Sequence, residues 1–100
     1  MNQTNPSAPA SLRGLVAVVT GGAKGIGLGI ARELAQAGCR IALWDFDDEA
    51  LQAAQRGLAS EGFDVKTFKV DVSSVEHVES TVAQLLASHA RIDILVNNAG

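Results

Sequence analysis

The stretch TGGAKGIG, Thr20–Gly27, follows a short apolar run and decides how this chain folds. Gly21, Gly25 and Gly27 follow the pattern G-x-x-x-G-x-G, whereas Ile30 stands where the more common dinucleotide-binding pattern G-x-G-x-x-G requires glycine. Glycines directly after a strand let the backbone turn sharply and approach a ligand, because no Cβ stands in the way. The stretch therefore predicts a tight turn between a strand and a helix.

Four apolar runs recur along the chain at a nearly constant interval. The polar residues that close them are Thr20, Asp45, Asp71 and Asn97, at intervals of 25, 26 and 26 residues. The runs are expected to be strands over residues 15–19, 40–44, 65–70 and 92–96. Three of them are nearly continuous, as strands buried on both faces require. The third alternates, and it is therefore expected nearest an edge of the sheet.

Between the runs, apolar residues recur every three or four positions, the spacing of one helix face. The first helix is expected to begin near Gly25 and to end at Gly38, and the third to begin with a capping box of Ser73 and Glu76. The predicted buried faces are Ile26, Ile30, Leu34 and Ala37; Leu51, Ala54 and Leu58; and Val75, Val78, Val82, Leu85 and Leu86. The order β-α-β-α-β-α-β indicates an α/β fold with a doubly wound parallel sheet, because strands joined by a helix run parallel.

Parallel strands place all four closing residues at the same carboxyl edge of the sheet, where open α/β sheets bind ligands. The helix near Gly25 is expected to aim unpaired N–H groups at this edge, which favours an anion such as a pyrophosphate. The alternative interpretation is that the glycines merely end a strand. Three glycines at this place make that interpretation the weaker of the two. The sequence therefore predicts a phosphate-bearing ligand at the turn.

Asp45 indicates which dinucleotide is bound. It lies 18 residues after Gly27, near the roughly 20 expected for a carboxylate that hydrogen-bonds a ribose 2′-hydroxyl. A carboxylate accepts hydrogen bonds from both ribose hydroxyls and repels a 2′-phosphate, so NAD is favoured over NADP. Lys24 argues for NADP, because a basic side chain beside the turn is able to pair with a 2′-phosphate. Asp45 outweighs it, since Asp45 would have to swing away to admit that phosphate.

Composition excludes several other functions. The 100 residues are 47% hydrophobic and 19% charged with a net charge of −3, which is typical of one packed domain and predicts no nucleic-acid partner. No apolar run approaches the roughly 18 residues of a membrane span, so no membrane partner and a cytoplasmic location are expected. Residues 1–14 are interpreted as a flexible leader, and residues 15–100 as the N-terminal part of a dinucleotide-binding domain.

Five single residues have structural interpretations that compete with functional ones. The lone Cys39 has no metal-ligand pattern around it and is expected to be buried at the start of a strand. His77 and His89 are too far apart on one helix to share a metal, so both are expected at the surface and no metal site is predicted. Trp44 and Phe46 flank Asp45 and are expected to pack in the core rather than on an adenine ring.

Three motifs together resemble the classical short-chain dehydrogenases/reductases. TGGAKGIG matches the T-G-x-x-x-G-x-G of that family, DV at Asp71 and Val72 matches its adenine-contacting motif, and NNAG at residues 97–100 matches its fourth-strand motif. The resemblance implies a Rossmann-type sheet of which this chain holds only the first half. It also implies site roles for the following residues: the pyrophosphate turn at Gly21, Gly25, Ile26 and Gly27 with Lys24 beside it, the adenosine ribose at Asp45, the adenine at Asp71 and Val72, the cofactor near the central ribose at Asn98, Ala99 and Gly100, and a tie between neighbouring strands at Asn97.

The resemblance further implies an NAD(H)-dependent oxidoreductase that acts on a small secondary alcohol or ketone and forms a homodimer or homotetramer. That family catalyses with a Ser and with the Tyr and Lys of Y-x-x-x-K, and the sequence has no tyrosine, so no catalytic residue is assigned. The chain is therefore interpreted as the cofactor-binding half of a longer enzyme. Two alternatives stay open: an NADPH-dependent 3-oxoacyl-carrier-protein reductase, which Lys24 favours and Asp45 opposes, and a noncatalytic NAD-binding or redox-sensing module.

Overall fold

A computed structural model describes residues 12–89 and 91–99 of the chain. The elements are β1 (Val16–Thr20), α1 (Gly25–Gln36), β2 (Arg40–Asp45), α2 (Asp48–Ser60), β3 (Val65–Lys69), α3 (Val75–His89) and β4 (Ile94–Asn97). The predicted alternation of four strands and three helices is confirmed. Most of the predicted leader, residues 1–11, lies outside the described residues, while Leu12 packs against the core.

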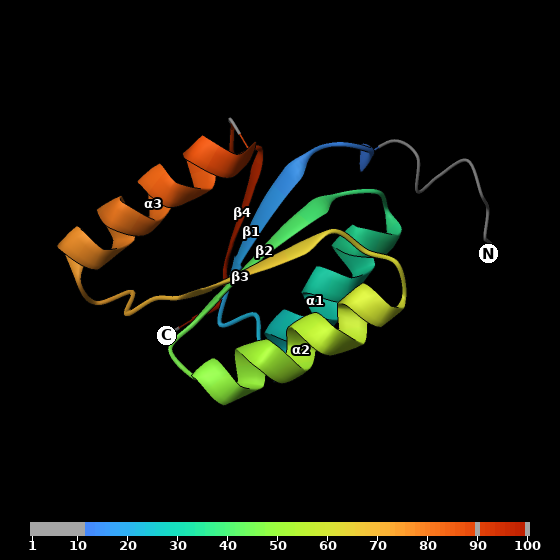
Figure 1. Cartoon of the computed structure of the whole chain (residues 1–100), viewed down its shortest axis with the longest axis horizontal. Coiled ribbons are helices and arrows are strands. Elements are labelled where there is room, and N and C mark those ends of the chain that lie inside the picture. The colour runs from blue at the N-terminus through green and yellow to red at the C-terminus, as the bar shows by residue number, and fades with distance from the viewer. Residues whose placement is uncertain (1–11, 90, 100) are drawn as a thin grey trace.

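All four strands are parallel, in the order β3-β2-β1-β4, with α1 and α2 on one face of the sheet and α3 on the other (Figure 1). The position of β3 at an edge confirms the expectation from its alternating sequence. Thr20 is in register with Trp44 on β2 and with Asn97 on β4. The carboxyl ends of β1, β2 and β4 therefore meet at one edge, which is where the candidate site lies.

Alternate residues of the central strands pack into two different cores. Ile41 and Leu43 of β2 face α1 and α2, whereas Ala42 and Trp44 face α3. From α2, the predicted face of Leu51, Ala54 and Leu58 is buried in the first core. Burial on both faces explains why the runs that form β1 and β2 are continuously apolar.

The prediction of which face of α1 is buried is wrong, because the helix is rotated about its axis relative to the expected orientation. Ile26 is 78% exposed, and the buried residues are Gly27, Ala31 and Ala35. Leu34 packs at the margin of the first core rather than at its centre. Small side chains on the inner face let the helix approach the sheet closely, so the largest apolar side chain is not the deepest one.

The predicted face and cap of α3 are also partly wrong. Val75 is 68% exposed and Leu86 is 41% exposed, while Leu85 is fully buried. The cap is Ser74, whose Oγ accepts a hydrogen bond from the His77 N–H at 3.2 Å. The hydroxyl of the expected cap, Ser73, instead donates to the Asp71 carboxylate, which removes it from the helix.

Both histidines depart from the expectation that they lie at the surface. His89 is 5% exposed, because it follows Leu85 by four residues on the inner face of α3. His77 is half-buried, and its Nδ1 accepts a hydrogen bond from the Asp71 N–H at 3.1 Å. Cys39 is 5% exposed directly before β2, which confirms its expected burial. None of the described helices is long and apolar enough to cross a bilayer.

Candidate functional site

The turn between β1 and α1 requires glycine for two different reasons. Gly21 and Gly25 have φ values of +62° and +58°, in the left-handed region that residues with a Cβ avoid. Gly27 has ordinary dihedrals, but a Cβ there would lie 2.1 Å from the carbonyl oxygen of Gly21. The first turn of α1 is therefore pressed directly against the end of β1.

The N-terminus of α1 is open to an anion. Lys24 is its N-cap residue and makes no side-chain capping hydrogen bond, and the first turn contains no acidic residue. Leading N–H groups of an α-helix have no partner within the helix, and the helix dipole adds positive potential at this end. The turn thus combines free donors, positive potential and close backbone approach, which suit a phosphate group.

The Asp45 carboxylate connects the end of β2 to this turn. Its Oδ2 accepts a hydrogen bond from the Ala23 N–H at 3.2 Å, and its Oδ1 accepts one from the Asp47 N–H at 3.1 Å. The side chain is half-buried, so one side of it faces solvent. A carboxylate has more acceptor positions than these two donors use, which leaves capacity for hydroxyl groups of a ligand.

Lys24 does not stand free beside Asp45. Its Nζ lies 3.0 Å from Oδ2 of Asp47, and Oδ1 of Asp47 caps α2 by accepting from the Ala50 N–H at 3.1 Å. The Ala50 N–H and the Lys24 ammonium hold the pKa of Asp47 below its usual value, and Asp47 raises the pKa of Lys24. Both groups are therefore charged at neutral pH.

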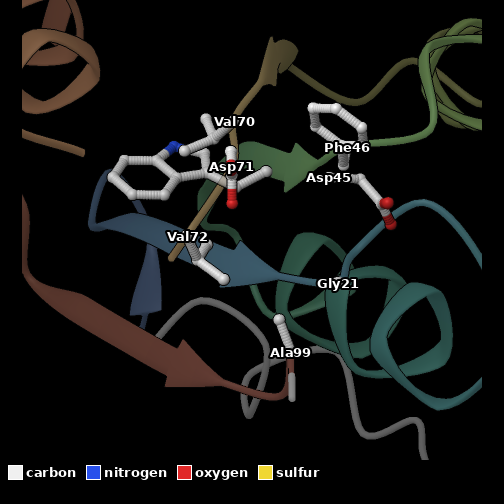
Figure 2. Close-up of a pocket in the computed structure, with 8 residues that line it drawn as sticks. Gly21, Asp45, Phe46, Val70, Asp71, Val72 and Ala99 are labelled. Atoms are coloured by element: carbon white, nitrogen blue, oxygen red, sulfur yellow. The ribbon is translucent and has the colours of Figure 1, made fainter. Parts of the chain in front are cut away.

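A cavity of about 250 Å³ opens beside Asp45 at the carboxyl edge of the sheet. Figure 2 shows its walls coming from the ends of all four strands, with the sequence-distant Asp45, Val72 and Ala99 around one space. The lining residues are Gly21, Trp44, Asp45, Phe46, Val70, Asp71, Val72 and Ala99. Five of them are site residues predicted from the sequence: Gly21, Asp45, Asp71, Val72 and Ala99.

The two aromatic residues at this cavity behave differently. Trp44 is 4% exposed and packs in the core with Val70, as expected. Phe46 is 64% exposed, so its predicted core position is wrong. It lies one residue beyond β2, and the Lys69 ammonium sits 5.2 Å from its ring centroid. That distance is within the range of a cation–π interaction.

Asp71 is organised by the residues that follow it. Its Oδ1 accepts hydrogen bonds from the Ser73 hydroxyl at 2.6 Å and from the Ser73 N–H at 3.0 Å. These donors hold the pKa of Asp71 below its usual value, so the carboxylate is ionised at neutral pH. Val72 is 46% exposed at the cavity, an apolar side chain available to a ligand.

Thr20 holds the end of β4 in place, a role that sequence reasoning missed. Its Oγ1 accepts hydrogen bonds from the N–H groups of Asn98 at 2.9 Å and Ala99 at 3.0 Å, and lies 3.3 Å from the Val96 carbonyl oxygen. Asn97 joins the same group, with its Oδ1 3.5 Å from Thr20 Oγ1. The only available signal was that Thr20 closes its run at the edge where Asn97 closes another.

The structure places the other predicted residues around the turn. The Asn98 amide donates to the Gly21 carbonyl oxygen at 3.3 Å, Ile26 is exposed at the start of α1, and Lys24 turns to Asp47. Gly100 lies outside the described residues. Within residues 12–89 and 91–99, no group of three or more His, Cys, Asp or Glu side chains is arranged to hold a metal ion.

Thr20→Val is expected to lower the free energy of unfolding by about 1 kcal/mol, the typical net contribution of a buried hydrogen-bond group. Valine has nearly the same shape but cannot accept from the two N–H groups of the β4 end. Urea unfolding followed by circular dichroism measures the change. Thr67→Val on β3 is the matched control, because the Thr67 side chain makes no hydrogen bond to any of the described residues. Equal effects of the two substitutions would contradict the assigned role of Thr20.

Comparison with known proteins gives the family of this chain. The sequence model described as short chain dehydrogenase matches residues 15–100. An uncharacterized oxidoreductase, YxjF of Bacillus subtilis (strain 168), is 45% identical over 89 residues, which cover 89% of this chain and 35% of that protein. The 3-oxoacyl-[acyl-carrier-protein] reductase FabG of Chlamydia pneumoniae is 41% identical over 90 residues, covering 90% of this chain and 36% of that protein.

Solved structures agree with the sequence relatives. A metagenomic short-chain oxidoreductase in complex with NADP is 42% identical with a TM-score of 0.85, covering 90% of this chain and 41% of that one. An NAD⁺-bound xylitol dehydrogenase is 39% identical with a TM-score of 0.85, covering 89% and 34%. The chain thus spans about a third of the length of the curated relatives it matches. With the family model matched along residues 15–100, the chain belongs to the short-chain dehydrogenase family.

Proposed function

We propose that this chain is the cofactor-binding part of an NAD(H)-dependent oxidoreductase that interconverts a small secondary alcohol and a ketone. The observation that carries the proposal is the Asp45 carboxylate, which stands at the end of β2, touches the glycine turn through the Ala23 N–H and lines the cavity. A carboxylate at this point accepts hydrogen bonds from ribose hydroxyls and repels a 2′-phosphate. The cofactor therefore is NAD rather than NADP.

The residues around the site fit a dinucleotide. The uncapped N-terminus of α1 and the close approach at Gly27 suit a pyrophosphate, and the exposed Val72 offers an apolar surface to an adenine ring. The nicotinamide, when bound, supplies the capacity to accept or donate a hydride. This chain's own residues bind and orient the cofactor. The residues that would hold it are Gly21, Gly25, Ile26 and Gly27 at the pyrophosphate, Asp45 at the adenosine ribose, Asp71 and Val72 at the adenine, and Asn98, Ala99 and Gly100 near the central ribose.

The relatives support the oxidoreductase class and leave a second candidate. The reductase FabG relative and the NADP complex favour an NADPH-dependent 3-oxoacyl-carrier-protein reductase. Lys24 is the residue of this chain that supports it, but Lys24 is paired with Asp47 and lies beside Asp45. The NAD⁺-bound xylitol dehydrogenase relative is compatible with the first candidate. The proposal includes a cytoplasmic location and a homodimer or homotetramer for the protein that contains this chain.

A noncatalytic NAD-binding or redox-sensing module is a separate alternative. It predicts NAD binding without turnover, whereas the enzyme proposal requires a Ser and a Y-x-x-x-K pattern in the protein that contains this chain. Assaying that protein with NAD and a panel of secondary alcohols separates the two. NAD binding in a protein that lacks those residues and shows no turnover would favour the module.

Asp45→Asn tests the cofactor assignment. The substitution is expected to weaken NAD binding about tenfold, because hydrogen bonds to a charged acceptor are lost, and to shift preference toward NADP. Isothermal titration calorimetry on the protein that contains this chain gives the dissociation constants for both cofactors. Asp64→Asn, in an exposed pair with Arg40, is the control for charge. An unchanged NAD to NADP ratio in Asp45→Asn would refute the assignment.

A further inference from the structure

The ion pair between Lys24 and Asp47 lies beside the Asp45 carboxylate, where the ribose 2′ position would be recognised. Lys24 follows Ala23, whose N–H binds Asp45, and Asp47 follows Asp45 by two residues. We infer that Asp47 is a specificity-determining residue, which excludes a 2′-phosphate by engaging Lys24 and by adding a second fixed negative charge beside Asp45. The inference rests on the proposed function and deepens it.

The Asp47 carboxylate is fixed independently of Lys24. Its Oδ1 caps α2 through the Ala50 N–H, and its own N–H donates to Asp45 Oδ1 at 3.1 Å. A 2′-phosphate that drew Lys24 away would therefore still meet two carboxylates, at Asp45 and Asp47. Exposed ion pairs are individually weak, so the pair with Lys24 alone would not exclude the phosphate. The second carboxylate, held by the Ala50 N–H, is what makes the exclusion effective.

Another lysine near Asp45 is also engaged. Lys69 is the register partner of Asp45 on β3, and its ammonium lies over the Phe46 ring at 5.2 Å. It is the obvious competitor of Lys24 as a phosphate ligand, so the experiment must tell the two apart. A free cation beside a phosphate makes a strong charge-assisted hydrogen bond, and Lys24 becomes free once Asp47 loses its charge.

Asp47→Asn is the test, with binding of NAD and NADP measured by isothermal titration calorimetry on the protein that contains this chain. Asparagine is as good an N-cap as aspartate, so α2 keeps its cap while the ion pair and the negative charge are lost. The expected result is an NADP affinity about tenfold higher, with NAD affinity changed less than about twofold. Asp47→Ser, which also caps, is a second variant should the first fold poorly.

Asp48→Asn is the matched control, because it removes the same charge one residue further along, from an exposed residue with no side-chain partner among the described residues. It is expected to change the ratio of affinities by less than about threefold, the size of a screened surface effect. Asp47→Asn combined with Lys24→Gln is expected to lose only the part of the gain in NADP affinity that the freed Lys24 contributes, because the negative charge of Asp47 is absent in both variants. An unchanged NADP affinity in Asp47→Asn, or an equal gain in Asp48→Asn, would overturn the inference.

Failure of the inference differs from failure of the proposed function. A protein that binds NAD but keeps its NAD to NADP ratio in Asp47→Asn would overturn the role of Asp47 alone. A protein that binds neither cofactor would overturn the proposed function, and the inference with it. The gain should also shrink between about 50 mM and 500 mM salt, because the interaction of Lys24 with the phosphate is screened.

Discussion

Gly27→Ala is expected to weaken dinucleotide binding about a hundredfold and to lower the free energy of unfolding by about 1–3 kcal/mol. The added Cβ would lie 2.1 Å from the Gly21 carbonyl oxygen and 2.7 Å from Nδ2 of Asn98. The first atom belongs to the backbone, so a side-chain rotation cannot relieve the contact. The start of α1 must therefore move away from β1, and its N–H groups lose their aim at the proposed phosphate position.

Gly29→Ala is the matched control for this prediction. Gly29 lies two residues further along the same helix, and among the described residues no atom outside that helix lies within 4 Å of the position of an added Cβ. Alanine at an open helical position is expected to stabilise the protein by about 0.5–1 kcal/mol without changing affinity. Urea unfolding and NAD titration of both variants provide the comparison. Wild-type NAD affinity in Gly27→Ala would show that the turn is not where the pyrophosphate binds.

The order of elements could be predicted from spacing because strand ends repeat every 25 or 26 residues, whereas the rotation of two helices could not. The inner face of α1 consists of Gly27, Ala31 and Ala35, which carry almost no hydrophobic signal. The inner face of α3 includes the polar Thr81 and His89. Which residues of a helix face inward depends on how closely that helix packs against the sheet. The hydrophobicity pattern along one helix contains no information about that packing distance.

The candidate site also has features that the sequence could predict and features that it could not. Gly21, Asp45, Asp71 and Ala99 could be expected at one edge because parallel strands end together, and the cavity brings them together. The pairing of Lys24 with Asp47 could not be expected, since it joins two separate loops through side-chain conformations. The exposure of Phe46 depends likewise on which helix covers the strand end. Topology is encoded in spacing, but contacts between segments have to be observed.

Leu58→Ala is expected to lower the free energy of unfolding by about 2–5 kcal/mol, the range for a large apolar side chain removed from a core. Leu58 is fully buried near the end of α2, in the core that also contains Ile41 and Leu43 of β2. Truncation of its side chain removes packing contacts between α2 and the sheet. Because β2 ends at Asp45 and α2 begins after Asp47, this core also supports the part of the site that we propose to select the cofactor.

Leu86→Ala on α3 provides the matched control, because Leu86 is 41% exposed and its truncation is expected to cost less than about 1 kcal/mol in this chain. Urea unfolding compares the two variants, and NAD titration at low temperature measures affinity while Leu58→Ala is still folded. Affinity should then stay within about threefold of wild type, since Leu58 lies more than two helical turns from Asp47. Equal destabilisation by the two substitutions would contradict the burial of Leu58, whereas a large loss of affinity would mean that the core sets the geometry of the site as well as its stability.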